Sequence, residues 1–318
     1  MTPEPAVDAA STEPARTRPA EWIAHRERGS VPLLKAMVFL SLTLGRAASR
    51  VLLHGIVLYF LLFAPSAGRQ SRHYLELALG RKPRLRDRYR HLFYFAACIH
   101  DRVYLVREQY LRFAVTIEGE SLMRELDDAR QGAFLMGAHM GSFEVMRGVA
   151  RREAGLTVSM AMYEHNARKI NAMMAAIDHE AKPDIIALGR IDTMLGIAER
   201  LSRGGFVGML GDRTLGDEPV QAVTLLGRRA YLPTGPMRAA ALLRRPVIFM
   251  VGLYRGGNRY HVVFAPVADF SATPPGERAQ AVSQAVARYA ELLDRYCRSD
   301  PYNWFNFFDF WRDRTRDP

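Results

Sequence analysis

Residues 133–144 read AFLMGAHMGSFE, and this short stretch decides the fold class. The run at 133–138 is apolar and short, which is typical of a buried strand. His139 and Gly141 then interrupt the apolar run and indicate a loop, and residues 143–153 have the pattern of a helix. A strand that ends in a loop and leads into a helix is the repeating unit of an α/β sheet.

The same alternation continues on the C-terminal side of this stretch. We expect further strands at 156–162, 185–188, 206–210, 222–226, 247–253 and 260–265. We expect helices between or after them at 165–181, 191–203, 234–245 and 276–298. This order predicts an α/β fold with a mixed, mostly parallel sheet flanked by helices. Such sheets bind ligands beyond the carboxyl ends of their strands, so the loops there are the place to look for a site.

The N-terminal part of the chain has a different character. Apolar runs occupy 36–44 and 51–64, and each is shorter than the ~20 residues of a clean membrane-spanning helix. If 33–64 is helical, four basic residues fall on one stripe: Lys35, Arg46, Arg50 and His54. A long apolar helix with a basic stripe is typical of a membrane interface with anionic headgroups. The alternative is a buried helix with a few arginines that extend to its surface.

These differences in character divide the chain into three parts. Residues 1–30 are rich in proline and small residues and are expected to be a disordered tail and entry segment. Residues 31–75 are expected to be a membrane-associated helical segment, which Pro65 interrupts. Residues 76–318 remain as the catalytic domain.

Composition limits the possible function classes. The chain has 318 residues, of which 49% are hydrophobic and 24% charged, and this is an ordinary globular composition. Its two cysteines exclude a disulfide scaffold and a four-cysteine zinc site. The net charge of +11 favours anionic partners such as nucleic acid, an acidic protein or an anionic membrane. The sequence contains no nucleic-acid-binding motif, so charge alone supports the first of these.

The loop after the first strand carries the best catalytic candidates. His139 in the loop and Glu144 in the first helical turn can meet if the backbone bends, and the carboxylate would then orient the imidazole as a general base. Gly141 would allow a substrate to approach the backbone, and amides at the helix start could stabilise an oxyanion. The ordinary alternative is that His139 is one of nine histidines without a special role. The chain lacks the serine nucleophile elbow, the phosphate-binding P-loop and the H-E-x-x-H zinc helix.

In its setting GAHMGSFEVMRG, this motif resembles the H-x4-D/E motif of the lysophospholipid acyltransferase superfamily, and more narrowly the bacterial lipid A biosynthesis (late) acyltransferase family. The resemblance runs from Trp22 to residue 311. The loop Gly211-Asp212-Arg213 matches the Asp-containing loop of the family, and Arg190 lies where relatives often have an arginine. The resemblance implies that His139 and Glu144 are catalytic. Substrate-binding residues are implied at Gly141, Ser142, Arg190, Asp212 and Arg213.

The resemblance also implies an activity. A fatty acyl group would move from acyl carrier protein, or acyl-CoA, to a hydroxyl of a lipid or glycolipid at the cytoplasmic face of the inner membrane, without a metal or cofactor. His139 would deprotonate the hydroxyl. Two segments depart from the family: DHEAK at 178–182 stands where the family has an Arg-rich patch, and the aromatic end at 301–311 stands where relatives have a basic stretch. Phosphates of lipid A would bind such arginines and lysines. Acceptors such as an aryl polyene or ornithine-type lipid therefore stay open, as does a non-catalytic lipid-binding protein with the same fold.

Overall fold

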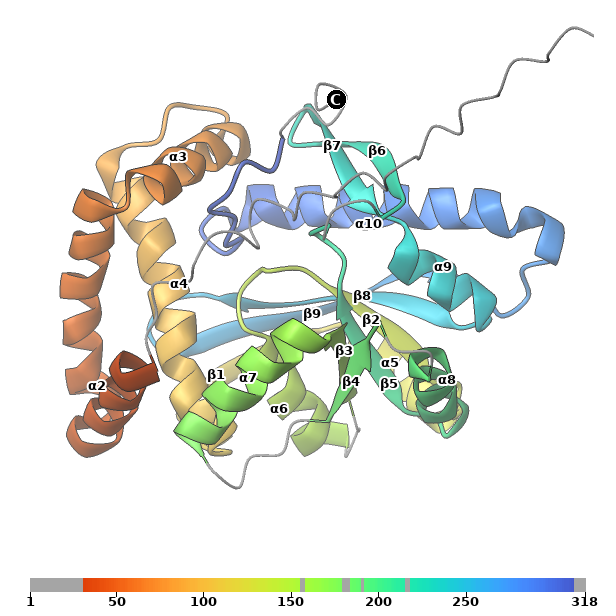
Figure 1. Ribbon diagram of the computed structural model, residues 1–318, viewed down its shortest axis with the longest axis horizontal. Helices are drawn as coiled ribbons and strands as arrows, with labels where there is room; N and C mark the ends of the chain where they lie inside the picture. Colours follow the sequence, from red (N-terminus) through yellow and green to blue (C-terminus); the bar gives the residue numbers. More distant parts are fainter. Residues whose placement is uncertain (1–30, 155–157, 179–183, 190–191, 215–217, 312–318) are drawn as a thin grey trace, which may run out of the picture.

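We analysed a computed structural model of the chain, which describes residues 31–154, 158–178, 184–189, 192–214 and 218–311. Its centre is a seven-stranded sheet with the strand order β1-β9-β8-β2-β5-β3-β4 (Figure 1). The strands are β1 (Ala114–Glu118), β2 (Ala133–Gly137), β3 (Val158–Tyr163), β4 (Ile185–Leu188), β5 (Phe206–Leu210), β8 (Pro246–Tyr254) and β9 (Arg259–Asp269). A separate antiparallel ribbon pairs β6 (Val220–Leu225) with β7 (Arg228–Pro233).

All neighbouring strands of the large sheet are parallel except β8 and β9, which form an antiparallel hairpin. The predicted mixed, mostly parallel sheet is therefore confirmed. The sequence analysis missed β1 and β7. Strand β1 lies at the edge of the sheet, and its residues alternate between exposed and half-buried positions instead of forming an apolar run. Strand β7 is exposed at Arg228 and Arg229 and is held by its partner β6.

Helices cover both faces of the sheet. They are α2 (Val31–Phe63), α3 (Pro65–Leu79), α4 (Leu85–Val106), α5 (Glu120–Asp128), α6 (Phe143–Ala154), α7 (Glu164–Ile177), α8 (Thr193–Ser202), α9 (Gly235–Leu242) and α10 (Arg278–Ser299). Figure 1 shows α9 and α10 on one face and α6 and α7 on the other. Alternate residues of β2 enter different cores: Phe134 and Met136 pack on the α10 side, and Leu135 packs on the α4 and α6 side.

Helix α2 forms an outer layer against α4 (Figure 1). It bends at Gly45, whose φ of 77° is left-handed and favours glycine. The hydroxyl of Tyr104 on α4 donates to the carbonyl oxygen of Ser41 at 2.6 Å, one turn before the bend. This bond satisfies a carbonyl group in the turn where the regular helix is interrupted.

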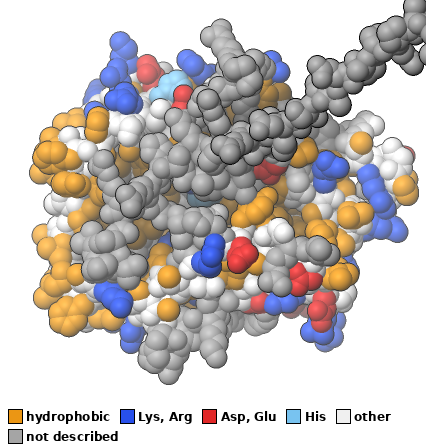
Figure 2. All heavy atoms as spheres, in the orientation of Figure 1, with side chains coloured by type: hydrophobic (Ala, Val, Ile, Leu, Met, Phe, Trp, Pro, Cys, Tyr) orange, Lys and Arg blue, Asp and Glu red, His pale blue; other side chains and the backbone are white. Residues whose placement is uncertain are grey.

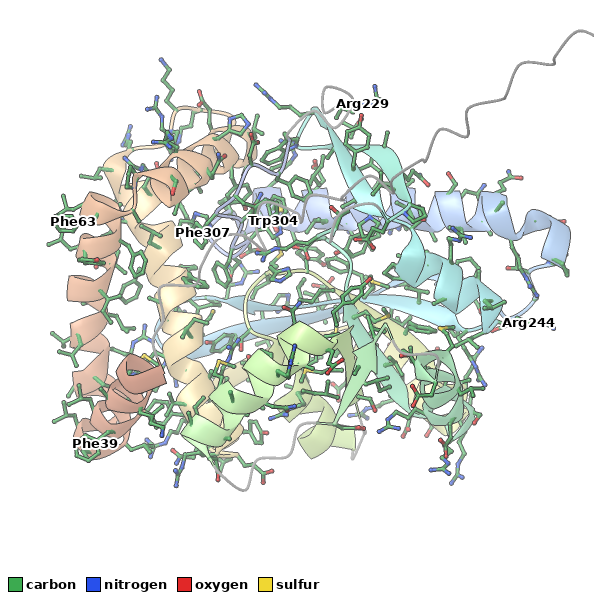
Figure 3. All side chains as sticks on the ribbon, viewed as in Figure 1. Phe39, Phe63, Arg229, Arg244, Trp304 and Phe307 are labelled. Carbon is green, nitrogen blue, oxygen red and sulfur yellow. The ribbon has the colours of Figure 1, made fainter. Side chains whose placement is uncertain are left out.

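The outer face of α2 is apolar and exposed. Hydrophobic side chains gather on the edge of the molecule where α2 lies (Figure 2), and Phe39 and Phe63 point outward from it (Figure 3). Seven large hydrophobic residues of α2 are more than half exposed: Phe39, Leu44, Val51, Leu58, Tyr59, Leu62 and Phe63. The stretch Lys35–Phe63 is long and apolar enough to cross a membrane by length and composition.

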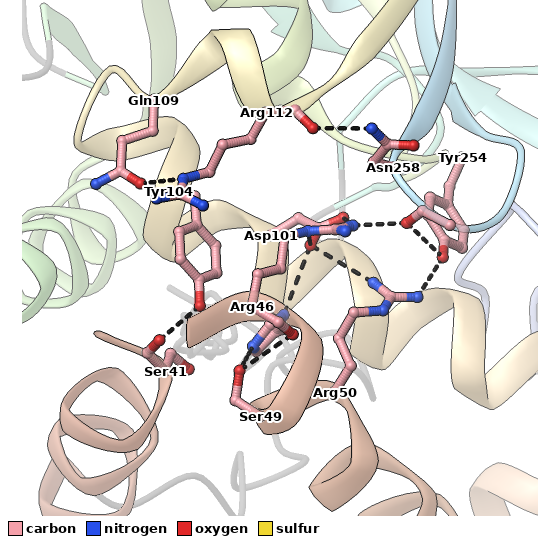
Figure 4. A network of polar contacts seen from close by, with 12 residues as sticks. Ser41, Arg46, Ser49, Arg50, Asp101, Tyr104, Gln109, Arg112, Tyr254 and Asn258 are labelled. Atoms are coloured by element: carbon pink, nitrogen blue, oxygen red, sulfur yellow. Dashed lines mark hydrogen bonds and ion pairs between the residues drawn. The ribbon is translucent and has the colours of Figure 1, made fainter. Parts of the chain in front are cut away.

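Arg46 and Arg50 of the basic stripe on α2 do not face outward as expected for binding to headgroups. Arg46 forms two hydrogen bonds with Asp101 of α4, at 2.8 and 2.9 Å, and Arg50 lies 3.6 Å from the same carboxylate (Figure 4). His54 stacks on Phe93 of α4, with 4.8 Å between ring centroids. The reason is that Asp101 is completely buried, and a buried carboxylate requires a cationic partner. Of the four stripe residues, Lys35 and His54 remain exposed, and His54 does so while it stacks on Phe93.

Candidate active site

The register of two parallel strands builds the centre of the site. Strands β2 and β5 are neighbours, and Gly137 at the end of one lies opposite Leu210 at the end of the other. The amide of Gly211 donates to the carbonyl oxygen of Gly137 at 3.0 Å, which continues the pairing by one step. His139 and Asp212 each follow their strand by two residues. They therefore meet at the carboxyl edge of the sheet, although 73 residues separate them.

His139 and Asp212 form a close pair. Nδ1 of His139 lies 2.8 Å from Oδ1 of Asp212, and the backbone amide of His139 donates to Oδ2 at 3.0 Å. An ionised carboxylate can only accept hydrogen bonds, so Nδ1 carries the proton and Nε2 keeps its lone pair. Among the described residues, Nε2 has no hydrogen-bond partner. One third of the His139 side chain is exposed, so the imidazole lies at the surface of the described fold.

The protonation states suit a base. Burial lowers the pKa of His139 below its usual value, and the positive charge of Arg213 lowers it further, while Asp212 acts in the opposite direction. Burial alone would raise the pKa of Asp212. The charges of His139 and Arg213 and the hydrogen bonds that Asp212 accepts nevertheless hold that pKa well below its usual range. At neutral pH the pair is therefore a neutral imidazole beside an ionised carboxylate.

A C-terminal segment at residues 301–311, which we call the strap, crosses over this edge of the sheet. The indole Nε1 of Trp304 donates to Oδ2 of Asp212 at 2.9 Å, and the amide of Phe305 donates to the carbonyl oxygen of His139 at 2.8 Å. Trp304 is buried, and its ring packs edge to face on that of Phe310, with 4.8 Å between the centroids; Figure 3 labels Trp304. The strap thus forms a hydrogen bond with each member of the pair.

Glu144 has a different partner from the one expected. Its Oε1 lies 2.6 Å from Nε of Arg102 on α4, and its Oε2 accepts from the hydroxyl of Ser142 at 3.3 Å. The carboxylate that orients His139 is that of Asp212, because Glu144 is turned toward α4 while Asp212 continues the neighbouring strand. Glu144 therefore contributes to the site by connecting α6 to α4 beside the His139 loop.

The backbone amides of Gly141 and Ser142 form hydrogen bonds within the protein. Gly141 has a φ of 67°, and a side chain there would lie 1.9 Å from the carbonyl oxygen of Gly252 on β8. Its amide donates to the carbonyl oxygen of Asn303 at 2.9 Å, and the amide of Ser142 donates to that of Gly252 at 2.8 Å. The close approach that glycine permits is therefore made by β8. These two amides are used within the fold; the oxyanion site expected at the start of α6 stays a prediction.

Arg213 and Arg190 are the remaining expected site residues. The guanidinium group of Arg213 donates to the carbonyl oxygen of Phe305 at 3.1 Å and lies over the ring of Phe308, 5.1 Å from its centroid. Its charge acts on His139, so it belongs to the site. Arg190 lies outside the described residues.

Sequence reasoning missed three residues: Asn303, Trp304 and Arg102. The aromatic end at 301–311 differed from the family in sequence, but its contact with Asp212 depends on a chain reversal that has no local signal. Among the described residues, no group of three or more histidine, cysteine or acidic side chains gathers where a metal could bind. The arrangement can take a proton from a hydroxyl group at Nε2, which a carboxylate-held imidazole does well.

A model of one protein family, described as bacterial lipid A biosynthesis acyltransferase, matches residues 25–313. The match covers nearly the whole chain and includes α2, the sheet, His139, Asp212 and the strap. No curated protein matches the chain.

Proposed function

The chain belongs to the bacterial lipid A biosynthesis acyltransferase family, and we propose that it transfers a fatty acyl group from a thioester to a hydroxyl group of a lipid or glycolipid, with His139 as the general base. Acyltransferase activity follows from the family in general. The observation that carries the role of His139 is the pair it forms with Asp212 through Nδ1, because Nε2 then keeps its lone pair on a side chain that is one third exposed.

In this proposal each residue has one task. Nε2 of His139 takes the proton of the acceptor hydroxyl as the oxygen attacks the thioester carbonyl, and the thiol leaves with a proton. Asp212 fixes the tautomer of His139 and stabilises the imidazolium that forms. Arg213 supplies positive charge near the imidazole and is our candidate for stabilising the oxyanion of the tetrahedral intermediate.

The donor and the acceptor are also proposals. Acyl carrier protein is acidic, and the net charge of +11 suits it as a donor. The acceptor is a lipid hydroxyl, and lipid A, an aryl polyene lipid and an ornithine-type lipid remain alternatives that lipid analysis separates.

The test is a thioester-consumption assay with acyl-carrier-protein and CoA thioesters and lipid extracts as acceptors, combined with mass spectrometry of lipids from cells with and without the protein. We expect His139→Gln to lower the rate by about 10²- to 10⁴-fold, since this is the usual contribution of a general base. Circular dichroism checks that the variant is folded. A rate within a few-fold of wild type would remove His139 from the mechanism, and unchanged lipids would favour a non-catalytic lipid-binding protein.

We also propose that α2 holds the enzyme on the cytoplasmic face of the inner membrane, with its apolar outer face in the lipid. Two observations support a helix that lies on the membrane rather than one that crosses it. The middle of α2 is tied to buried Asp101 through Arg46 and Arg50 (Figure 4), and the exposed residues from Phe39 to Phe63 lie along the side away from α4 (Figure 3). Crossing the bilayer would bring these ion-paired groups into hydrocarbon at a high cost.

Truncation tests the anchor. Deleting residues 1–20 should leave membrane binding unchanged, whereas deleting residues 1–64 should release or aggregate the protein. Fractionation through a high-salt wash separates the two outcomes. A protein without residues 1–64 that is active and stays on membranes in high salt would place the anchor elsewhere. Burial of apolar surface at ~25 cal/mol per Å² is insensitive to salt, so wild type should survive the wash.

A further inference from the structure

A second concave site lies on the same edge of the sheet as His139 but does not include it. This cavity has a volume of 570 Å³ and lies between α4, the β8–β9 turn and the start of the strap. Strand β8 is parallel to β2 and ends at the cavity, and β1 and β9 begin there. The volume lies in the range of ordinary small-molecule sites, about 300–1,000 Å³.

The charge of the lining is strongly positive. Three arginines line the cavity from two sides: Arg90 on α4, and Arg255 and Arg259 at the β8–β9 turn. The one carboxylate in the lining is that of Asp300, which is buried and paired with Arg255. Each guanidinium group has five N–H donors. Arg90 donates to the phenol oxygen of Tyr94 and Arg259 to the carbonyl oxygen of Arg255, so both groups have donors left for a ligand.

Arginines that converge on a small concave space favour a compact polyanion. Guanidinium groups match the geometry of phosphate oxygens and bind them through two hydrogen bonds at a time. Arg90 is fixed against the rings of Tyr94 and Tyr302, with 5.1 and 4.6 Å to the centroids, so part of the site is already ordered.

The cavity is adjacent to the helix that we assign to the membrane. Tyr254 lines the cavity, and its hydroxyl accepts a hydrogen bond from Arg50 of α2. The carbonyl oxygen of Gly257, in the turn beside Arg255, accepts one from Arg46 at 2.6 Å. A ligand in the cavity would therefore lie close to the lipid-facing layer.

The cavity is also connected to the loop of His139. Asn303 lines the cavity, its backbone oxygen accepts from Gly141, and its side chain bonds to both backbone groups of Tyr254. We propose that this cavity binds the phosphate-bearing headgroup of a lipid, next to the His139 site and separate from it.

The experiment uses the full-length protein in nonionic detergent and measures binding by calorimetry without an acyl donor. The probes are inorganic pyrophosphate, dihexanoyl phosphatidic acid and dihexanoyl phosphatidylcholine. We expect one site that binds phosphatidic acid at least about tenfold more tightly than phosphatidylcholine, with pyrophosphate as a competitor. The variant Arg90→Gln/Arg259→Gln leaves the Arg255–Asp300 pair intact and should weaken phosphatidic acid binding by about tenfold or more.

The matched control is Arg228→Gln/Arg229→Gln, which also removes two positive charges. Both arginines are exposed on β7 and lie outside the cavity lining, and Figure 3 labels Arg229. It should bind as wild type does. His139→Gln should also bind normally, so a failure of the proposed catalysis and a failure of this site give different results. Equal binding by the cavity variant and the β7 control would overturn the proposal. Binding of pyrophosphate without a preference for phosphatidic acid would refute the lipid source and assign the site to a soluble phosphate.

Discussion

Two buried aspartates, Asp212 and Asp101, each hold a basic group from a distant part of the chain. Asp212 at the carboxyl edge of the sheet binds His139, and Asp101 on α4 binds Arg46 and Arg50 of α2. Their side chains are 1% and 0% exposed, so burial does not distinguish them. Both are ionised, because opposite charges and hydrogen bonds outweigh the effect of burial on each pKa.

The two sites differ in whether the basic partner of the aspartate can still accept a proton. His139 uses Nδ1 for Asp212 and keeps a second nitrogen, and one third of its side chain is exposed. The arginines have no lone pair and cannot take a proton, and 14% of each side chain is exposed. The Asp101 carboxylate also accepts from Tyr260 at 2.9 Å. A buried carboxylate therefore indicates a catalytic site only when its partner can still exchange a proton with substrate, and otherwise it indicates a structural connection.

The largest expected effect comes from Asp212→Asn. Oδ2 accepts two N–H groups, from the backbone of His139 and from Trp304, so the amide oxygen must take that position. The amide NH₂ then faces Nδ1 of His139 and forces the proton onto Nε2, where the base is needed. We expect kcat/KM to fall by about 10²- to 10⁴-fold, with little change in Tm, because every hydrogen bond is kept.

The pH profile checks the same prediction. A base must be neutral, so the wild-type rate should fall as pH drops through the pKa of His139, which burial places below the usual histidine value. Asp212 raises that pKa, so its removal should shift the acid limb to still lower pH while the plateau falls. A full-rate Asp212→Asn enzyme, or an acid limb that moves to higher pH, would contradict the role given to this carboxylate.

The second effect is on stability. Asp101→Asn removes the charge that Arg46 and Arg50 share. Breaking a buried ion pair in this way typically costs about 3–5 kcal/mol, and we expect a loss of about this size in the free energy of unfolding. Thermal and chemical unfolding measure the loss, and protease cleavage in α2 should become faster. The kcat/KM of the protein that remains folded should stay near wild type, in contrast to Asp212→Asn.

A double variant tests the reason for this loss. Arg46→Met/Asp101→Leu replaces the main pair with apolar groups, and such replacements are often neutral when the volume is kept. We expect it to recover much of the stability lost by Asp101→Asn. No recovery would show that the attraction between the charges stabilises the docking of α2, and that the loss in Asp101→Asn does not come from leaving an arginine unpaired.

The same comparison explains what the sequence could and could not predict. Ala133–Gly137 and Phe206–Leu210 are buried on both faces, so their apolar runs predict them as strands without knowledge of their neighbours. The meeting of His139 with Asp212 depends on β2 and β5 being adjacent, which no local pattern encodes. Glu144 was the expected partner because it lies in the first turn after the His139 loop and completes the H-x4-D/E motif. The basic stripe predicted the helix α2 correctly, but Arg46 and Arg50 point toward α4 and not toward headgroups. The sequence could not show this locally, because their counter-charge at Asp101 lies 55 residues from Arg46.

The smallest effect, from Trp304→Phe, tests how far the strap shares in the site. The substitution keeps a large ring against Tyr74 but removes the N–H that donates to Oδ2 of Asp212. That oxygen still accepts from the backbone of His139, so the pair should persist with a less firmly held carboxylate. A hydrogen bond to a charged group is worth about 1.5–3 kcal/mol, and since only part of this acts on the transition state, we expect kcat to fall about tenfold. Trp311→Phe is the matched control, because its indole lies on the same strap and donates instead to the carbonyl oxygen of Leu225 at 3.3 Å. Equal losses in the two variants would show that the strap acts by packing alone, whereas a loss confined to Trp304→Phe would make its indole a positioning group for the His139–Asp212 pair.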